Sequence, residues 1–224
     1  MILSRRIGDN SADTFGKEDL NDLCDLLAAK DKRIKQILIE FGYPPFWHRN
    51  PEFQSLVMII LEQQVSLASA FSTFQKLKEK LVDITPENIQ KMSDDDFKTC
   101  GFSRQKKTYV EGLADEVAND RLNLEQLKSE DAGTIRKKLL KIKGIGNWTV
   151  DIYLLSCLHK LDIFPIGDLA LIKSMVQAKI IKETDSKEDI LRKTEKLKPY
   201  RSIFTIIMWH RYIKSNNIQV QFDL

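Results

Sequence analysis

The stretch KIKGIGNWTVDIYLL, residues 141–155, interrupts a chain that otherwise has the hydrophobic periodicity of helices. Gly144 and Gly146 stand two residues apart in it, between a basic, apolar run and a longer apolar run. Glycine is unfavourable inside a helix and takes positive φ angles without penalty. The pair therefore predicts a tight turn between one helix that ends near Lys141 and another that begins near Asn147.

Two interpretations of this turn stay open on its spacing alone. It is either a simple connection between two core helices or a grip on a phosphate. A helix N-terminus carries partial positive charge, and glycines let a phosphate come close to the backbone N–H groups. Lys138, Lys141 and Lys143 lie beside the turn and would attract a nucleic-acid backbone, although a solvated lysine is the commoner case.

Length and composition indicate an ordinary globular protein. The 224 residues can form one substantial core or two small lobes; 42% of them are apolar and 30% charged. The net charge of +3 permits a nucleic-acid partner without requiring one. Residues 1–6 lack the apolar segment of a secretory signal, and apolar stretches such as residues 56–61 are too short to span a bilayer, so we expect no membrane partner.

The three cysteines, Cys24, Cys100 and Cys157, are far apart in the sequence. They form no CxxC pair and no Cys/His cluster with zinc spacing. Three thiolates are also one short of a typical iron–sulfur cluster, so no such cluster is expected. We predict that all three are reduced and buried.

Hydrophobic spacing predicts an all-α chain with about ten helices. Asn50-Pro51, Thr85-Pro86 and Ser93 are predicted helix starts, because each places a capping side chain before a first turn. Only residues 218–222 alternate like a strand. The main predicted helices cover residues 19–41, as one helix or two, 53–62, 66–81, 105–118, 123–128, 132–141, 147–158, 169–180, 187–197 and 202–214.

Five segments resemble, in the same order, the helix-hairpin-helix superfamily of DNA glycosylases. Within it, they are most similar to the 3-methyladenine DNA glycosylase II family, from about Pro44 to Tyr212. The segments are EQQVS (62–66), GFSRQKKTYVEGLA (101–114), LLKIKGIGNWTVDIYLL (139–155), FPIGDLALIK (164–173) and KPYRSIFTIIMW (198–209).

The resemblance implies a two-lobed, all-α fold with the active site in the interlobe cleft. The central lobe would hold residues 52–160, with the helix-hairpin-helix at 139–155. A terminal helical lobe would combine residues 17–51 with residues 161–224. Residues 1–16 are predicted to be a flexible arm, because their periodicity is weak.

The resemblance makes Asp168 the catalytic carboxylate. It would stabilise positive charge on the sugar as the damaged base leaves, and orient or deprotonate the attacking water. Asp168 directly precedes an apolar helix, so a capping role is the structural alternative, and one side chain can do both. Asp151 is the nearest rival carboxylate, but it lies where the family has no acid.

Aromatic residues are the expected walls of the base pocket. Trp148 stands where bifunctional members carry a lysine that attacks the sugar, so we predict a monofunctional hydrolase without AP-lyase activity. Trp148 and Trp209 would stack on an alkylated, electron-poor base, with core packing as the alternative for each. Phe46 and Trp47 either wall this pocket or pack a loop. Ile152 replaces a tyrosine of the family's pocket, which leaves the substrate range open.

The resemblance also assigns DNA contacts. Gln64 matches the wedge that fills the gap left by a flipped nucleotide; the alternative is an amide that bonds the local backbone. The backbone carbonyls of the hairpin turn would hold a Na⁺ or K⁺ ion that meets a phosphate. The predicted backbone contacts are Gly144, Gly146, Lys143, Arg104 and Lys106, and the predicted carbonyl ligands belong to Leu140, Ile142 and Ile145.

The expected function is excision of 3-methyladenine or 7-methylguanine from duplex DNA, which leaves an abasic site in base excision repair. The enzyme would be monomeric, would require no cofactor, and would work at the nucleoid of a bacterium or in a eukaryotic nucleus. Two alternatives remain: a glycosylase for a deaminated or oxidised purine, and a non-catalytic DNA-binding module.

Overall fold

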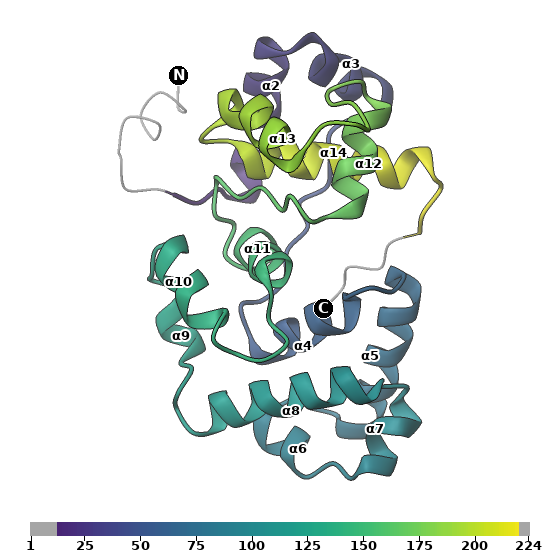
Figure 1. The fold of residues 1–224 in the computed structure, drawn as a ribbon, viewed down its shortest axis with the longest axis vertical. Coiled ribbons are helices and arrows are strands. Elements are labelled where there is room, and N and C mark those ends of the chain that lie inside the picture. The colour runs from purple at the N-terminus through teal and green to yellow at the C-terminus, as the bar shows by residue number, and fades with distance from the viewer. Residues whose placement is uncertain (1–12, 220–224) are drawn as a thin grey trace. The chain divides into compact units, whose positions relative to one another are not determined.

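The computed structural model describes residues 13–219, whose regular secondary structure is almost entirely helical (Figure 1). Thirteen α-helices and two short 3-10 helices form in this range. The β-structure within residues 13–219 is one isolated antiparallel bridge between Thr14 and Lys160. The predicted all-α fold is confirmed. Of the predicted strand at 218–222, residues 218 and 219 are not in a strand, and residues 220–222 lie outside the described range.

The described chain divides into two compact units. The first unit comprises residues 13–47 and 154–219, and the second comprises residues 48–153. The sequence predicts lobes that divide at 51/52 and 160/161, whereas the two units divide at 47/48 and 153/154.

The first unit is built around the C-terminal helix, which packs against α2, α3 and α12. The first half of this helix is apolar on nearly every side, so it is buried without interruption from Ser202 to Met208. The elements of the unit are η1 (Lys17–Asp19), α2 (Leu20–Lys30), α3 (Lys32–Phe41), α12 (Leu169–Gln177), α13 (Lys187–Thr194), η2 (Glu195–Leu197) and α14 (Arg201–Ser215).

The second unit is built around α4, which packs against α5 and α8. Nine of the ten residues of α4 are buried, as expected for a helix with so continuous an apolar sequence. The elements of the unit are α4 (Phe53–Glu62), α5 (Leu67–Leu81), α6 (Pro86–Gln90), α7 (Asp94–Cys100), α8 (Arg104–Ala118), α9 (Leu124–Leu127), α10 (Ala132–Leu139) and the greater part of α11 (Asn147–Ser156).

Most predicted helix starts are confirmed by their caps. The side chains of Thr85 and Ser93 accept hydrogen bonds from backbone N–H groups in the first turns of α6 and α7. The predicted start at Asn50-Pro51 is wrong, because α4 begins at Phe53. The Glu52 N–H donates to the Asn50 carbonyl at 2.7 Å, a local turn that delays the helix.

The N-terminal segment departs from the predicted flexible arm. Residues 1–12 lie outside the described range. In residues 13–16, however, Phe15 is only 5% exposed, and its N–H donates to the His159 carbonyl at 3.0 Å. The prediction is therefore wrong for residues 13–16, because burial of the Phe15 ring fixes this part of the chain on the first unit.

Cys24, Cys100 and Cys157 are free and buried, as predicted. Burial, with a smaller contribution from Asp25, raises the pKa of the Cys24 thiol to about 12. None of the helices within residues 13–219 is long and apolar enough to cross a membrane.

Candidate active site and DNA-binding hairpin

Asp168 caps the N-terminus of α12 in the first unit. Its Oδ1 accepts the Leu171 N–H at 2.8 Å, and its carbonyl accepts the Ile172 N–H at 3.0 Å. The residue is 9% exposed. A carboxylate in this place is stabilised by the positive end of the helix dipole as well as by the hydrogen bond. The capping interpretation is thus confirmed, and the cap fixes the position of the carboxylate.

Trp209 contacts the same carboxylate from a different helix. Its indole Nε1–H donates to Oδ1 of Asp168 at 3.0 Å, across the packing of α12 against α14. The Trp209 ring also lies beside Trp47, with ring centroids 6.5 Å apart. The first unit therefore brings together three predicted site residues from three separate parts of the sequence.

Phe46 lies in a different cluster from its neighbour Trp47. Its ring centroid is 4.6 Å from that of His159 and 6.1 Å from that of Phe15, so packing accounts for it. Residues 42–50 are not helical, and within them Trp47 faces Trp209 whereas its neighbour does not. A place for Phe46 in the base pocket stays a prediction.

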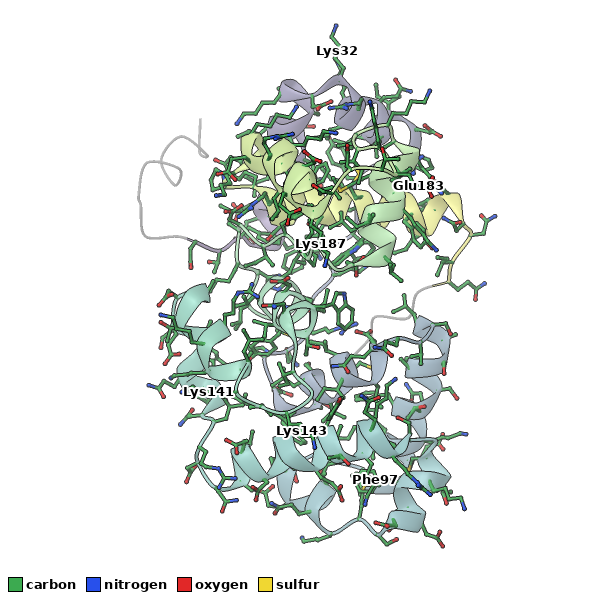
Figure 2. All side chains as sticks on the ribbon, in the orientation of Figure 1. Lys32, Phe97, Lys141, Lys143, Glu183 and Lys187 are labelled. Carbon is green, nitrogen blue, oxygen red and sulfur yellow. The ribbon has the colours of Figure 1, made fainter. Side chains whose placement is uncertain are left out.

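The predicted hairpin is present in the second unit between α10 and α11. Gly144 has a φ of +92°, as a tight turn requires, and the Ile145 N–H closes the turn on the Ile142 carbonyl at 3.1 Å. Arg136 on α10 donates to Asn147 and to the carboxylate of Asp151 on α11, which braces the two helices. Lys141 and Lys143 lie on the turn (Figure 2). Both side chains are exposed.

The two glycines of the hairpin have different surroundings. A Cβ atom on Gly144 would lie 2.1 Å from the ring of Tyr109 on α8, which is an impossible approach. A Cβ atom on Gly146 would meet nothing within 4 Å. Gly144 is therefore required by internal packing and by its φ angle, whereas the space beside Gly146 is open to a ligand.

The remaining predicted residues of α11 have mixed environments. Trp148 is half-buried, and Ile152 is 6% exposed. Asp151, the rival carboxylate, is engaged by Arg136 in an ion pair. Its partner gives Asp151 a structural role, which supports Asp168 as the better catalytic candidate.

The start of α8 carries two of the predicted phosphate contacts. Arg104 is exposed. Lys106 instead donates its Nζ proton to the Leu61 carbonyl at 2.5 Å, and partial burial lowers the pKa of its ammonium group. Lys106 already caps the end of α4, so Arg104 is the better placed of the two for a phosphate.

Sequence reasoning missed the contribution of Gln63. Its Nε2 donates to the Gly144 carbonyl and to Thr149 Oγ1, each at 2.9 Å. The neighbouring Gln64 is exposed and has a positive φ of 58°. The pair Gln63-Gln64 is recognised in the sequence as a break between two helices. No local pattern, however, predicts a hydrogen bond from Gln63 to a residue 81 positions away.

A cation at the hairpin would be held by backbone oxygen atoms. The described residues contain no group of three or more His, Cys, Asp or Glu side chains that could hold a metal ion. The Ile142 carbonyl already accepts one hydrogen bond within the turn, and a carbonyl oxygen has a second lone pair. The carbonyls of Leu140, Ile142 and Ile145 are hard oxygen ligands, so their chemistry fits Na⁺ or K⁺.

Residues 57–199 match the model of the HhH-GPD superfamily of base excision DNA repair proteins. This chain belongs to that superfamily. The match includes the hairpin, Asp168 and the loop with Gln64, and it confirms the resemblance drawn from the five sequence segments.

Two HhH-GPD relatives resemble the chain in sequence. A DNA-3-methyladenine glycosylase of Bacillus subtilis is 29% identical over 169 residues, which are 70% of this chain and 56% of the relative. The chain thus spans little more than half the length of that relative. The crystal structure of a DNA-3-methyladenine glycosidase from Bacillus halodurans is 27% identical, with a TM-score of 0.70, over 85% of this chain and 89% of that one.

A third relative supports the fold. The structure of the Schizosaccharomyces pombe 3-methyladenine DNA glycosylase in complex with abasic DNA has a TM-score of 0.76 and 22% identity. It covers 89% of this chain and all of that one. At this identity the similarity concerns the helical HhH-GPD architecture.

Proposed function

We propose that this HhH-GPD protein is a monofunctional DNA glycosylase that removes alkylated purines in base excision repair. The observation that carries the proposal is the Asp168 carboxylate, which accepts hydrogen bonds from the Leu171 N–H and from the indole N–H of Trp209. The Bacillus relatives named as 3-methyladenine glycosylases support the choice of substrate class.

The reaction requires little more than a fixed negative charge and a bound base. A base inside a duplex cannot be attacked in place, so the enzyme flips the damaged nucleotide out of the stack. 3-Methyladenine and 7-methylguanine carry positive charge in DNA and leave readily. Asp168 stabilises the charge that develops on the sugar as the bond to the base breaks, and it orients or deprotonates the water that completes hydrolysis.

Tryptophans supply the recognition of a cationic base in this proposal. Trp209 and Trp47 in the first unit offer π faces to an alkylated purine. Trp148 occupies the place where a lyase would need lysine, so the product is an intact abasic strand and not a Schiff base.

Duplex DNA is the proposed partner. The open backbone at Gly146 and the exposed side chains of Lys143 and Arg104 would bind phosphates of the DNA backbone. The hairpin carbonyls would hold a monovalent cation that adds to this attraction. We propose that a monomer suffices, at the nucleoid of a bacterium or in the nucleus of a eukaryote.

Base release from methylated DNA tests the proposal directly. Duplex DNA treated with a methylating agent is incubated with the protein, and free bases are separated by chromatography. The proposal predicts release of 3-methyladenine or 7-methylguanine, strands that break only after alkali, and no covalent adduct after borohydride treatment. Absence of released base would contradict the glycosylase activity, and a borohydride-trapped adduct would contradict the monofunctional mechanism.

A second candidate function is excision of a deaminated or oxidised purine. Ile152, where the family's pocket has a tyrosine, favours it, because an apolar side chain changes what the pocket accepts. The same assay on duplexes with a single hypoxanthine or 8-oxoguanine separates the candidates. Faster release of either base than of 3-methyladenine would favour the second.

A further inference from the structure

The loop between α4 and α5 exposes an unusual run of side chains. Gln64 is exposed and has the left-handed φ of 58°, which costs a residue with a side chain about 1 kcal/mol. Val65 and Leu67 follow it and are 44% and 38% exposed, although both are apolar. Gln64 and Val65 on the loop and Leu67 at the first position of α5 therefore lie outside the core.

The end of α4, from which this loop emerges, is held firmly. Glu62 forms a two-fold hydrogen-bonded ion pair with Arg49, and both side chains are only 5% exposed. Lys106 donates to the Leu61 carbonyl one residue earlier. These contacts fix the last turn of α4. The path of the loop after this turn depends on the contacts of Gln63.

Gln63 connects the loop to the hairpin. Its side-chain nitrogen donates to the Gly144 carbonyl and to the hydroxyl of Thr149. A carbonyl can only accept, so the orientation of the amide is determined by its partner. Thr149 is 2% exposed and both hydrogen bonds are partly buried, so water weakens them less than it would at the surface.

We infer that Gln63 is a positioning residue that couples the phosphate grip of the hairpin to the wedge at Gln64. The inference rests on the proposed function. A DNA backbone held at Gly146 lies at a fixed distance from the loop only while Gln63 keeps the two segments together. The wedge then enters the stack beside the gripped phosphate and holds it open after the base has flipped.

The test separates opening of the stack from binding. The full-length protein is titrated onto a duplex that carries a tetrahydrofuran abasic analogue next to 2-aminopurine, whose fluorescence rises when it unstacks. Gln63→Met keeps the length of the side chain and removes its hydrogen bonds. Gln54→Met makes the same change on the first turn of α4, where the side chain bonds Glu52 at the surface, and is the matched control.

We expect wild type and Gln54→Met to give the full fluorescence rise at saturation. Gln63→Met should lower the equilibrium constant for opening of the base stack about threefold to tenfold, which is the loss expected for one hydrogen bond. The affinity of the protein for the duplex should change less. Thr149→Val removes one of the two acceptors and should give a partial loss; it is used if Gln63→Met does not fold.

The double variant Gln63→Met/Gln64→Ala decides between coupling and independent effects. If Gln63 acts only through Gln64, the double variant should open the base stack to the same extent as Gln64→Ala alone. A full fluorescence rise in Gln63→Met, or additive losses in the double variant, would overturn the inference. Base release by the wild type is measured separately, so excision with an unchanged Gln63→Met signal contradicts only this inference, whereas no excision contradicts the proposed function.

Discussion

The indole Nε1 of Trp209 lies 3.0 Å from Oδ1 of Asp168 and donates a hydrogen bond to it. The same oxygen accepts the Leu171 N–H at 2.8 Å. One donor belongs to the first turn of α12, and the other reaches across from α14. Two rigid helices thus fix the position of one carboxylate oxygen, which is the kind of preorganisation that electrostatic catalysis needs.

Loss of the indole donor should slow base release without unfolding the protein. Trp209→Phe keeps an aromatic ring and removes the N–H, so we expect the single-turnover rate to fall about tenfold to a hundredfold, as for a hydrogen bond to a charged group. Trp209→His keeps a ring N–H donor and should recover part of the rate. A Trp209→Phe protein that works at the wild-type rate would show that this bond has no catalytic value.

Alanine substitutions of the two hairpin glycines should affect different properties, stability at Gly144 and DNA binding at Gly146. Gly144→Ala forces a methyl group into the Tyr109 ring at a φ of +92° and should lower the free energy of unfolding by about 2 kcal/mol or more. Gly146→Ala meets nothing inside the protein and should leave thermal stability nearly unchanged, but weaken DNA binding. Denaturant titration and fluorescence anisotropy with a duplex measure the two quantities. Unweakened binding by Gly146→Ala would exclude this glycine from the phosphate contact.

Replacement of Asp151 should affect stability more than chemistry. Asp151→Asn leaves Arg136 without its ionised partner and should lower the free energy of unfolding by about 1–2 kcal/mol, a value reduced because Arg136 is about one-third exposed. Below its melting temperature the variant should still release base from saturated DNA. Loss of base release in a folded Asp151→Asn protein would instead make Asp151 a second catalytic candidate.

Asp31 should contribute to acid stability. The pKa of Asp31 is lowered to about 2, mainly by hydrogen bonds from the Arg33 side chain. Burial of the carboxylate acts in the opposite direction and raises this pKa. Because the pKa in the folded protein lies below that of the unfolded chain, the stabilisation is complete above about pH 4 and is lost as the pH falls towards 2.

Unfolding free energies of wild type and Asp31→Asn, measured between pH 2 and pH 6, check this contribution. The difference between the two proteins should be at most about 2 kcal/mol near pH 6 and should shrink as the pH falls. A constant difference across this range would mean that the charge of Asp31 plays no part.

Local signals in the sequence were sufficient for the helices and for the hairpin. Ser93 and Thr85 cap helices as predicted, since capping depends on residues within one turn. The Gly144 turn follows from the tolerance of glycine for positive φ. The helix start predicted at Asn50-Pro51 is wrong, because the residue types that cap a helix also favour a local turn.

Contacts between distant residues were beyond the reach of the sequence patterns. Nothing near Gln63 indicates that its amide bonds the hairpin, and nothing near Gly144 indicates a tyrosine ring against it. The resemblance to a family named Asp168 and Trp209 separately, and only the packing of α12 on α14 shows that they touch. The separation of Phe46 from Trp47 likewise depends on the backbone path after α3.

Base release by an Asp168→Asn variant shows whether Asp168 is the catalytic carboxylate. Asparagine keeps the shape and can still accept the hydrogen bonds of Leu171 and Trp209, but it carries no charge. We expect the wild type to release 3-methyladenine or 7-methylguanine from methylated duplex DNA, whereas Asp168→Asn should bind the same DNA with similar affinity and release almost none. Base release by Asp168→Asn at the wild-type rate would mean that the charge of Asp168 is not needed for catalysis.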